Sequence, residues 1–173
     1  MIACMLALAL AVATPGTPAH PHQSSMTRHR SAASEAEVGA RQWLKEFDRA
    51  FRARDLKAVM ALYSDDVVAY DVVAPLQYVG KEAYRKDFEQ FFAQYDGPLE
   101  TEYRDVHILA AKDMAVIATL ERISGTIKGQ RASLWLRATT VLRKVHGSWL
   151  DVHDHVSVPA DVETGKALLD LRP

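Results

Sequence analysis

The chain contains almost no cysteine and almost no net charge. Cys4 is the single cysteine among 173 residues, so an intramolecular disulfide is excluded and a cysteine-based structural zinc site is not possible. The 21 Lys and Arg nearly balance the 22 Asp and Glu, and the formal net charge of -1 creates no field that attracts nucleic acid or anionic lipid. With 49% hydrophobic residues, the composition is that of one globular domain held by an apolar core. We therefore expect a small-molecule ligand as partner, and neither nucleic acid nor membrane.

The chain also lacks an apolar run of membrane-spanning length. The run at residues 2–13 is shorter than the about 20 residues that a membrane helix needs, and small residues suitable for cleavage follow it. We expect residues 1–33 to be a signal peptide and a disordered leader, which would place the protein in the periplasm or outside the cell. A leader on a cytoplasmic protein is the alternative. His20, His22 and His29 fall in this leader, where a Pro- and Ser-rich linker would not fix metal ligands, so no metal site is expected.

Three helices are expected in the first half of the remaining chain. Ser34 and Glu37 have the spacing of a capping box, which predicts a helix start at Ser34. Asp55 can cap a second, short helix, and Gly80 precedes a third. The first helix has an apolar stripe at Ala40, Trp43, Leu44, Phe47, Ala50 and Phe51. The third has an aromatic stripe at Tyr84, Phe88, Phe91, Phe92 and Tyr95. We expect both stripes to pack against a sheet, because aromatic residues at this spacing usually bury large areas.

Extended segments fill the second half. A β-branched run at residues 67–73 predicts a first strand, and four long runs follow at 100–109, 114–126, 132–145 and 148–158. Hairpin-sized connections between the long runs predict sequential antiparallel strands, with a bulge or bend at Gly125. The expected fold is α+β, with three N-terminal helices packed on a strongly curved antiparallel sheet. It would form a cone-shaped α+β barrel with an internal pocket over residues 34–160, followed by a tail at 161–173 that could add one helical turn.

Several motifs in this order resemble the nuclear transport factor 2-like superfamily, especially its SnoaL-like and ketosteroid-isomerase-like members. The resemblance covers residues 35–159 and depends on the motifs Arg54-Asp55-Leu56, Ala61–Val67, Gly80–Ala83 and Gly147–Ser157. It implies the cone-shaped fold. It does not imply one activity, because the fold hosts isomerases, cyclases, hydratases and non-catalytic association domains.

The resemblance implies that Asp71 takes the place of the isomerase general base at the end of the first strand. Val67 and Ala69 alternate with Asp71, so its side chain points into the hollow if their face is buried. Desolvation there would raise the pKa of Asp71 toward the range useful for proton abstraction. By the same resemblance, Phe47 and Thr139 replace the two donors to the substrate oxygen. Both positions would still contact a substrate, but steroid-type isomerisation is not expected.

The last strand carries the motif His153-Asp154-His155. Strict alternation places Trp149, His153 and His155 on one face of the strand and Asp154 on the other. The resemblance implies that the face of Asp154 lines the cavity and that the other is the outer face of the sheet, where subunits associate. We expect the histidines to be structural or part of a homodimer interface; a metal site would need a third ligand from a neighbouring strand. Asp154 either forms a proton-transfer pair with Asp71 or a buried salt bridge with an arginine.

For four further side chains, the sequence leaves two interpretations open. Arg137 would bind an anionic substrate if it points inward and would join the interface if it points outward. Tyr70, Tyr78 and Trp135 are candidates for the pocket rim or for the core. Tyr78 is counted with Phe47, Arg137, Thr139 and Asp154 among the candidate substrate contacts.

The sequence therefore predicts a SnoaL-like small-molecule-binding domain. Its chemistry would be acid–base catalysis without a cofactor on a small hydrophobic substrate, of the isomerase, cyclase or hydratase kind. The alternative is a non-catalytic ligand-binding or dimeric association module of the same fold. An epoxide-hydrolase-like member is disfavoured, because Thr139 stands where an Asp-Arg-Asp set would need a carboxylate.

Overall fold

The computed structural model describes the backbone of residues 23–173 and the side chains from Glu35 onward. The apolar run at 2–13, His20 and His22 lie outside the described residues, so export stays a prediction. None of the described helices is both long and apolar enough to span a membrane.

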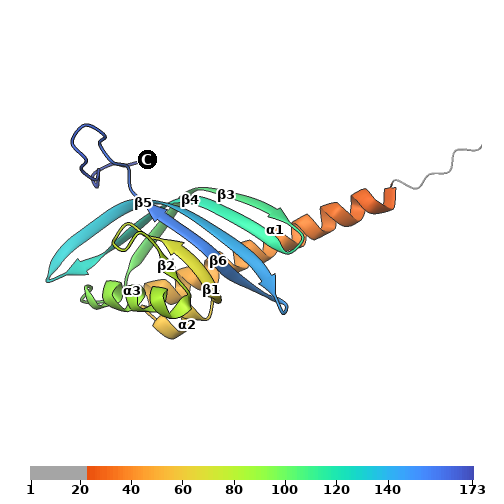
Figure 1. The fold of residues 1–173 in the computed structure, drawn as a ribbon, viewed down its shortest axis with the longest axis horizontal. Coiled ribbons are helices and arrows are strands. Elements are labelled where there is room, and N and C mark those ends of the chain that lie inside the picture. The colour runs from red at the N-terminus through yellow and green to blue at the C-terminus, as the bar shows by residue number, and fades with distance from the viewer. Residues whose placement is uncertain (1–22) are drawn as a thin grey trace, which may run out of the picture.

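The elements follow the expected order, with one unexpected short strand, β2, before the third helix. They are α1 (Gln23–Arg52), α2 (Leu56–Met60), β1 (Tyr63–Tyr70), β2 (Tyr78–Val79), α3 (Lys81–Ala93), β3 (Glu100–Ala111), β4 (Met114–Ile127), β5 (Gln130–Val145) and β6 (Ser148–Ser157). One six-stranded sheet has the order β2-β1-β6-β5-β4-β3. Figure 1 shows this sheet curving over the three helices, which all lie on its concave side. The α+β fold class is confirmed.

The sheet differs from the expected one in two ways. β1 runs parallel to β6, so the sheet is mixed, whereas every other neighbouring pair is antiparallel. A parallel neighbour is possible because β1 and β6 are far apart in the chain and no hairpin joins them. The sheet also ends at β2 and β3 and does not close into a barrel.

Three local predictions are corrected. α1 begins at Gln23 and not at Ser34, because residues 23–34 contain no proline or glycine to stop a helix. Gly125 stays in register with Ala132 without a bulge, and its missing side chain makes room for Tyr95, whose ring would lie 2.6 Å from a Cβ there. The tail forms a turn closed by a bridge between Ala160 and Ala167 and contains no helix.

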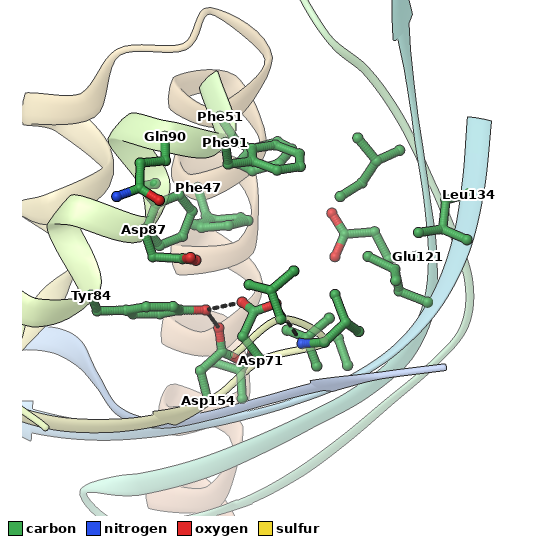
Figure 2. Close-up of a pocket in the computed structure, with 18 of the residues that line it drawn as sticks. Phe47, Phe51, Asp71, Tyr84, Asp87, Gln90, Phe91, Glu121, Leu134 and Asp154 are labelled. Carbon is green, nitrogen blue, oxygen red and sulfur yellow. Dashed lines mark hydrogen bonds between the residues drawn. The ribbon is translucent and has the colours of Figure 1, made fainter. Parts of the chain in front are cut away.

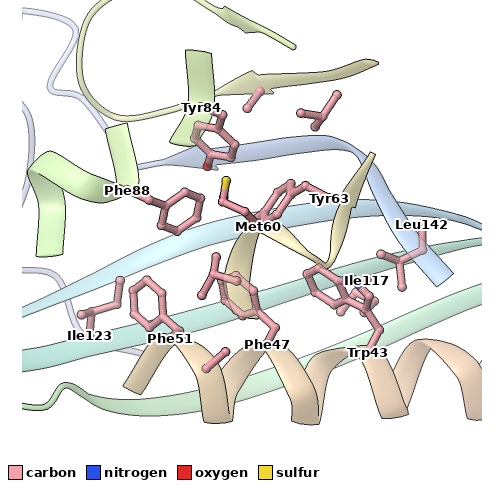
Figure 3. Packing of buried hydrophobic residues seen from close by; sticks show 14 of the residues in the cluster. Trp43, Phe47, Phe51, Met60, Tyr63, Tyr84, Phe88, Ile117, Ile123 and Leu142 are labelled. Carbon is pink, nitrogen blue, oxygen red and sulfur yellow. The ribbon is translucent and has the colours of Figure 1, made fainter. Parts of the chain in front are cut away.

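The core lies between the helices and the concave face of the sheet. Trp43, Phe47 and Phe51 of α1 are all buried, and Trp43 stacks on Phe47 with ring centroids 5.2 Å apart. α3 adds Tyr84 and Phe88 (Figure 3), and also Phe92, to the same cluster. Both predicted stripes are thus confirmed as core-forming, and each fully buried side chain of this size contributes roughly 1.5–3 kcal/mol.

The last strand does not alternate strictly. Leu142 of β5 faces Asp151, and its neighbour Val141 faces His153, so Val152 is an extra residue in a β-bulge. Residues before the bulge therefore change faces relative to the expected pattern. Asp151 is fully buried, and the indole of Trp149 packs on α1, where a Cβ at Gly39 would lie 2.0 Å from Trp149 Nε1. The expected placement of Trp149 on the outer face is wrong.

Candidate functional site

A cavity of about 440 Å³ lies between the helices and the concave face of the sheet. Aromatic side chains of α1 and α3 form one wall, and aliphatic side chains of β4 and β5 form the opposite wall (Figure 2). The lining includes Trp43, Phe47, Phe51, Phe91, Ile123, Leu134, Leu136 and Ala138. Its volume and its mostly apolar walls are those of a site for a small molecule. Phe47 lies where a substrate contact was expected.

Asp71 follows the end of β1 and lines the cavity. Its Oδ1 accepts a hydrogen bond from the Val72 N–H at 2.6 Å, and its Oδ2 accepts one from the Tyr84 hydroxyl at 3.1 Å. Burial raises the pKa of Asp71, and the nearby Asp87 raises it further, while these hydrogen bonds oppose the rise. Asp71 therefore combines a stronger tendency to take up a proton with a fixed orientation toward the cavity.

Asp154 lies on β6 beneath the same wall and is 5% exposed. Its Oδ1 accepts from the Thr140 hydroxyl at 3.2 Å, and its Oδ2 lies 3.3 Å from the hydroxyls of both Tyr63 and Tyr84. Burial raises the pKa of Asp154 to about 6, and Asp71 adds to the rise, against the hydrogen bonds of Thr140 and the two tyrosines. No arginine among the described residues pairs with Asp154, so the buried salt bridge is not formed there, and Asp154 is instead linked to Asp71 through the Tyr84 hydroxyl.

The Tyr84 hydroxyl joins the two carboxyl groups (Figure 2). It has one proton and can donate to only one of them at a time. When Asp154 is protonated, it can donate to the Tyr84 oxygen while Tyr84 donates to Asp71. Burial raises the pKa of Tyr84 well above its ordinary value, so the phenol stays protonated and remains a donor. The three groups all line the cavity and form a hydrogen-bond relay along its wall.

Asp87 is a cavity acid that the sequence analysis did not single out. It lies one helical turn after Tyr84 on α3, and the Tyr78 hydroxyl lies 2.8 Å from its Oδ1 and 3.0 Å from the Ala74 carbonyl oxygen. Burial raises the pKa of Asp87, and Tyr78 opposes the rise. Tyr78 does not line the cavity itself, so it holds Asp87 instead of contacting a ligand. The helical spacing from the aromatic stripe was the available signal for Asp87.

Glu121 is a second missed residue and lies across the cavity from Asp71 (Figure 2). It stands on β4 directly opposite Tyr103 of β3, and both side chains line the cavity. Glu121 is 7% exposed, and burial raises its pKa to about 8. Neither Glu121 Oε1 nor the Tyr103 hydroxyl has a hydrogen-bond partner among the described residues. Its alternation with buried Ile117 and Ile123 could have identified Glu121 from the sequence.

Asp151 is buried beside this site without lining the cavity. Both of its carboxyl oxygens lack a hydrogen-bond partner among the described residues. Burial raises the pKa of Asp151 well above its ordinary value, and the neighbouring Asp154 raises it further. The bulge at Val152 causes this burial, and no local sequence pattern marked the bulge.

Arg137 and Thr139 do not reach the cavity. β5 pairs with β4 in unbroken register, which directs Leu136, Ala138 and Thr140 inward and their odd-numbered neighbours outward. Arg137 is exposed and donates from Nη2 to the Val158 carbonyl oxygen at 3.0 Å. The inward reading of Arg137 and the expected substrate contact of Thr139 are therefore corrected, and Thr140 takes the inward place. Trp135 also lies outside, with the Arg104 and Arg122 guanidinium groups over its ring.

The histidines of β6 lie on the outer face, as expected. His153 Nδ1 is 2.8 Å from the Val68 carbonyl oxygen, and the rings of His153 and His155 both meet Tyr70 edge-on. Their part in an interface stays a prediction. Among the side chains described from Glu35 onward, no three His, Cys, Asp or Glu are arranged to hold a metal ion.

The fold and cavity define a class of protein: a single α+β domain whose curved open sheet covers an apolar, acid-containing hollow, as in the nuclear transport factor 2-like superfamily. Residues 40–161 match the family model of the SnoaL-like domain, so the chain belongs to that family.

Solved structures agree with this assignment. An NTF2-like protein of unknown function from Pseudomonas putida KT2440 is 36% identical, with a TM-score of 0.72 over 83% of this chain and 98% of its own. A ketosteroid isomerase-like protein from Erwinia carotovora atroseptica SCRI1043 is 24% identical, with a TM-score of 0.57 over 72% of this chain and 94% of its own. A candidate dehydratase of the NTF2-like family from Streptomyces avermitilis is 16% identical, with a TM-score of 0.64 over 72% and 97%. No curated protein sequence matches the chain.

Proposed function

We propose that the cavity binds a small apolar carbonyl compound and that Asp71 removes and returns a proton on it without a cofactor. The observation that carries this proposal is the Tyr84 hydroxyl, which lies 3.1 Å from Asp71 and 3.3 Å from Asp154 at the cavity wall. A general base must face its substrate, be held in place and have a pKa raised from that of an exposed carboxylate. Asp71 meets all three conditions.

The relay explains how the site can tolerate the proton that Asp71 receives. A proton passes from the carbon next to the carbonyl group to a carboxylate oxygen of Asp71, and the electron pair stays on the substrate as an enolate. Tyr84 then no longer needs to donate to Asp71 and can turn to Asp154 Oδ2. Reprotonation of the enolate restores the starting arrangement. The apolar walls exclude water and so preserve the raised pKa between the two steps.

Hydrogen–deuterium exchange tests the proposal without knowledge of the natural substrate. Small cyclic and aryl alkyl ketones would be incubated with the protein in deuterated buffer, and loss of their α-proton signals would be followed by ¹H NMR. We expect exchange faster than in buffer, saturating with ketone concentration. Saturable binding with no acceleration would reject the catalytic half and favour the non-catalytic binding module. Neither binding nor exchange for any ketone would reject both.

We also propose that two copies associate through the outer face of the sheet. All three helices lie on the other face (Figure 1), and the outer face presents exposed Tyr70 and Leu109 beside half-buried Trp135 and Val141. The formal net charge of -1 produces little repulsion between copies. Light scattering should therefore give twice the chain mass of 19.2 kDa. A Tyr70→Glu change should shift the mass toward that of one chain, and a monomeric parent protein would contradict the proposal.

A further inference from the structure

The charged side chains that line the cavity are all acidic. Asp71, Asp87 and Asp154 lie on one side and Glu121 on the other, and no Lys, Arg or His among the described residues lines it. An anionic ligand would therefore meet like charges in a poorly solvated space. A ligand with a positive group would instead supply the counter-charge that the chain itself does not place there.

Glu121 and Tyr103 form a polar position without internal partners. They are opposite one another in the β3–β4 register, and Glu121 is 7% exposed. Glu121 Oε1 and the Tyr103 hydroxyl are both buried, and neither has a partner at hydrogen-bond geometry among the described residues, although the Tyr103 hydroxyl lies near enough to lower the pKa of Glu121 against the effect of burial. Figure 2 shows the Glu121 carboxyl group directed away from its strand toward the aromatic wall. Buried polar atoms are normally bonded, so this pair is suited to a polar group of a ligand.

The groups around Glu121 do not neutralise it. Asp48 of α1, Tyr103 of β3 and Asp154 of β6 are the titratable side chains that act on it, and none carries a positive charge. Arg122, its neighbour on β4, is directed to the outer face, where it lies over Trp135 and pairs with Glu102 at 2.6 Å. A cation reaching Glu121 must therefore come from the ligand.

The wall that faces Glu121 suits the apolar body of a ligand. Phe47, Phe51 and Phe91 stack in sequence, with centroid distances of 5.4 Å and 5.6 Å, and all three line the cavity. The same rings provide the apolar surface for the rest of a ligand.

We propose that the ligand of this cavity carries a protonated amine, which binds between Glu121 and Tyr103, on an apolar body that packs on the Phe47–Phe51–Phe91 wall. This deepens the proposed function, on which it rests, because the other end of such a ligand would face Asp71. The substrate class becomes an amino ketone in place of a neutral ketone. The ammonium donates to the Glu121 carboxylate and to the Tyr103 oxygen, which satisfies both unpartnered atoms.

Three probes of similar size test the charge preference: 2-phenylethylamine, 2-phenylethanol and phenylacetate, titrated by isothermal calorimetry at neutral pH. We expect the amine to bind at least about tenfold more tightly than the alcohol, and phenylacetate to bind most weakly. Because burial raises the pKa of Glu121 to about 8, the amine should release a proton from Glu121 when it binds. Titrations in two buffers of different ionisation heat measure that release on the unmodified protein.

Glu121→Gln keeps the shape of the side chain and removes its charge. It should reduce amine affinity by about tenfold, abolish proton release and leave alcohol affinity unchanged. Glu163→Gln, an exposed glutamate in the tail, is the matched control and should change none of these. Equal affinity for amine and alcohol in the unmodified protein would overturn the amine class and leave ketone exchange intact. Binding of none of the three probes would overturn the amine class, and ketone exchange would still decide the proposed function separately.

Discussion

Asp71→Asn is expected to slow ketone exchange by a factor on the order of 10² to 10⁴, the usual contribution of a general base. An asparagine amide has the same shape but cannot accept the substrate proton. Its oxygen can still accept the Val72 N–H or the Tyr84 hydroxyl, so the local structure should persist. Burial raises the pKa of Asp71, so the neutral amide should also leave the free energy of unfolding unchanged or slightly higher. Exchange rates by NMR and urea denaturation measure the two effects separately.

A smaller change on Tyr84 distinguishes the relay from the base. Tyr84→Phe keeps a ring that packs on Phe88 and Tyr63, with centroids 4.8 Å and 5.5 Å away, and removes only the bridging hydroxyl. We expect exchange to slow by about tenfold, with a shift in its pH profile, because Asp71 and Asp154 lose their shared donor. Tyr70→Phe, on the outer face, is the matched control.

An Asp71→Asn protein that exchanges ketone protons at the parent rate would show that another group is the base.

The sequence predicted the scaffold well because the scaffold depends on periodicity. The stripes from Ala40 to Phe51 and from Tyr84 to Tyr95 identify buried faces, and helical spacing alone assigns them. Asp71 was identified through the family resemblance, and its alternation with apolar Val67 and Ala69 predicted that its side chain points into the cavity. The same reasoning applied to β4 would have found Glu121 between Ile117 and Ile123, so that omission was avoidable.

The bulge at Val152 could not be found in this way. Alternation tells which residues share a face only within an unbroken strand, and one inserted residue reverses the assignment on one side of it. Asp154 was placed correctly because it follows the bulge, whereas Asp151 and Trp149 precede it. For Arg137 the alternation would have been sufficient. Its direction was left open because a bulge in its strand would reverse it, but β5 pairs with β4 without a bulge. Tyr84 was correctly assigned to the core. The role of its hydroxyl could not be predicted, because it depends on two carboxyl groups, Asp71 and Asp154, that are far from each other in the sequence and are brought together by the pairing of β1 with β6.

Stability is expected to fall as the pH rises from about 4 to about 8, the reverse of the usual behaviour of exposed, salt-bridged acids. The pKa of Glu121 is raised from 4.5 to about 8 and that of Asp154 from 3.8 to about 6, and burial also raises the pKa values of Asp71, Asp87 and Asp151. In this window the folded chain holds protons that the unfolded chain has lost. The free energy of unfolding must then decrease with pH, and the decrease ends once each folded-state pKa is passed.

Glu121 is the group whose removal should change this slope most clearly. Deprotonation of Glu121 should lower the free energy of unfolding by roughly 3–5 kcal/mol between about pH 4.5 and pH 8, since one pKa unit corresponds to about 1.4 kcal/mol. Urea denaturation at about pH 5, 6.5 and 8 should therefore show a falling free energy of unfolding for the parent and a flatter profile for Glu121→Gln. Glu163→Gln should retain the parent slope, because this exposed glutamate makes no buried contact. Two results would contradict this prediction: a free energy of unfolding of the parent that rises from pH 5 to pH 8, or a pH slope that Glu121→Gln leaves unchanged. Either would mean that the fold stabilises the cavity acids as anions. A cation in the ligand would then no longer be needed to balance them.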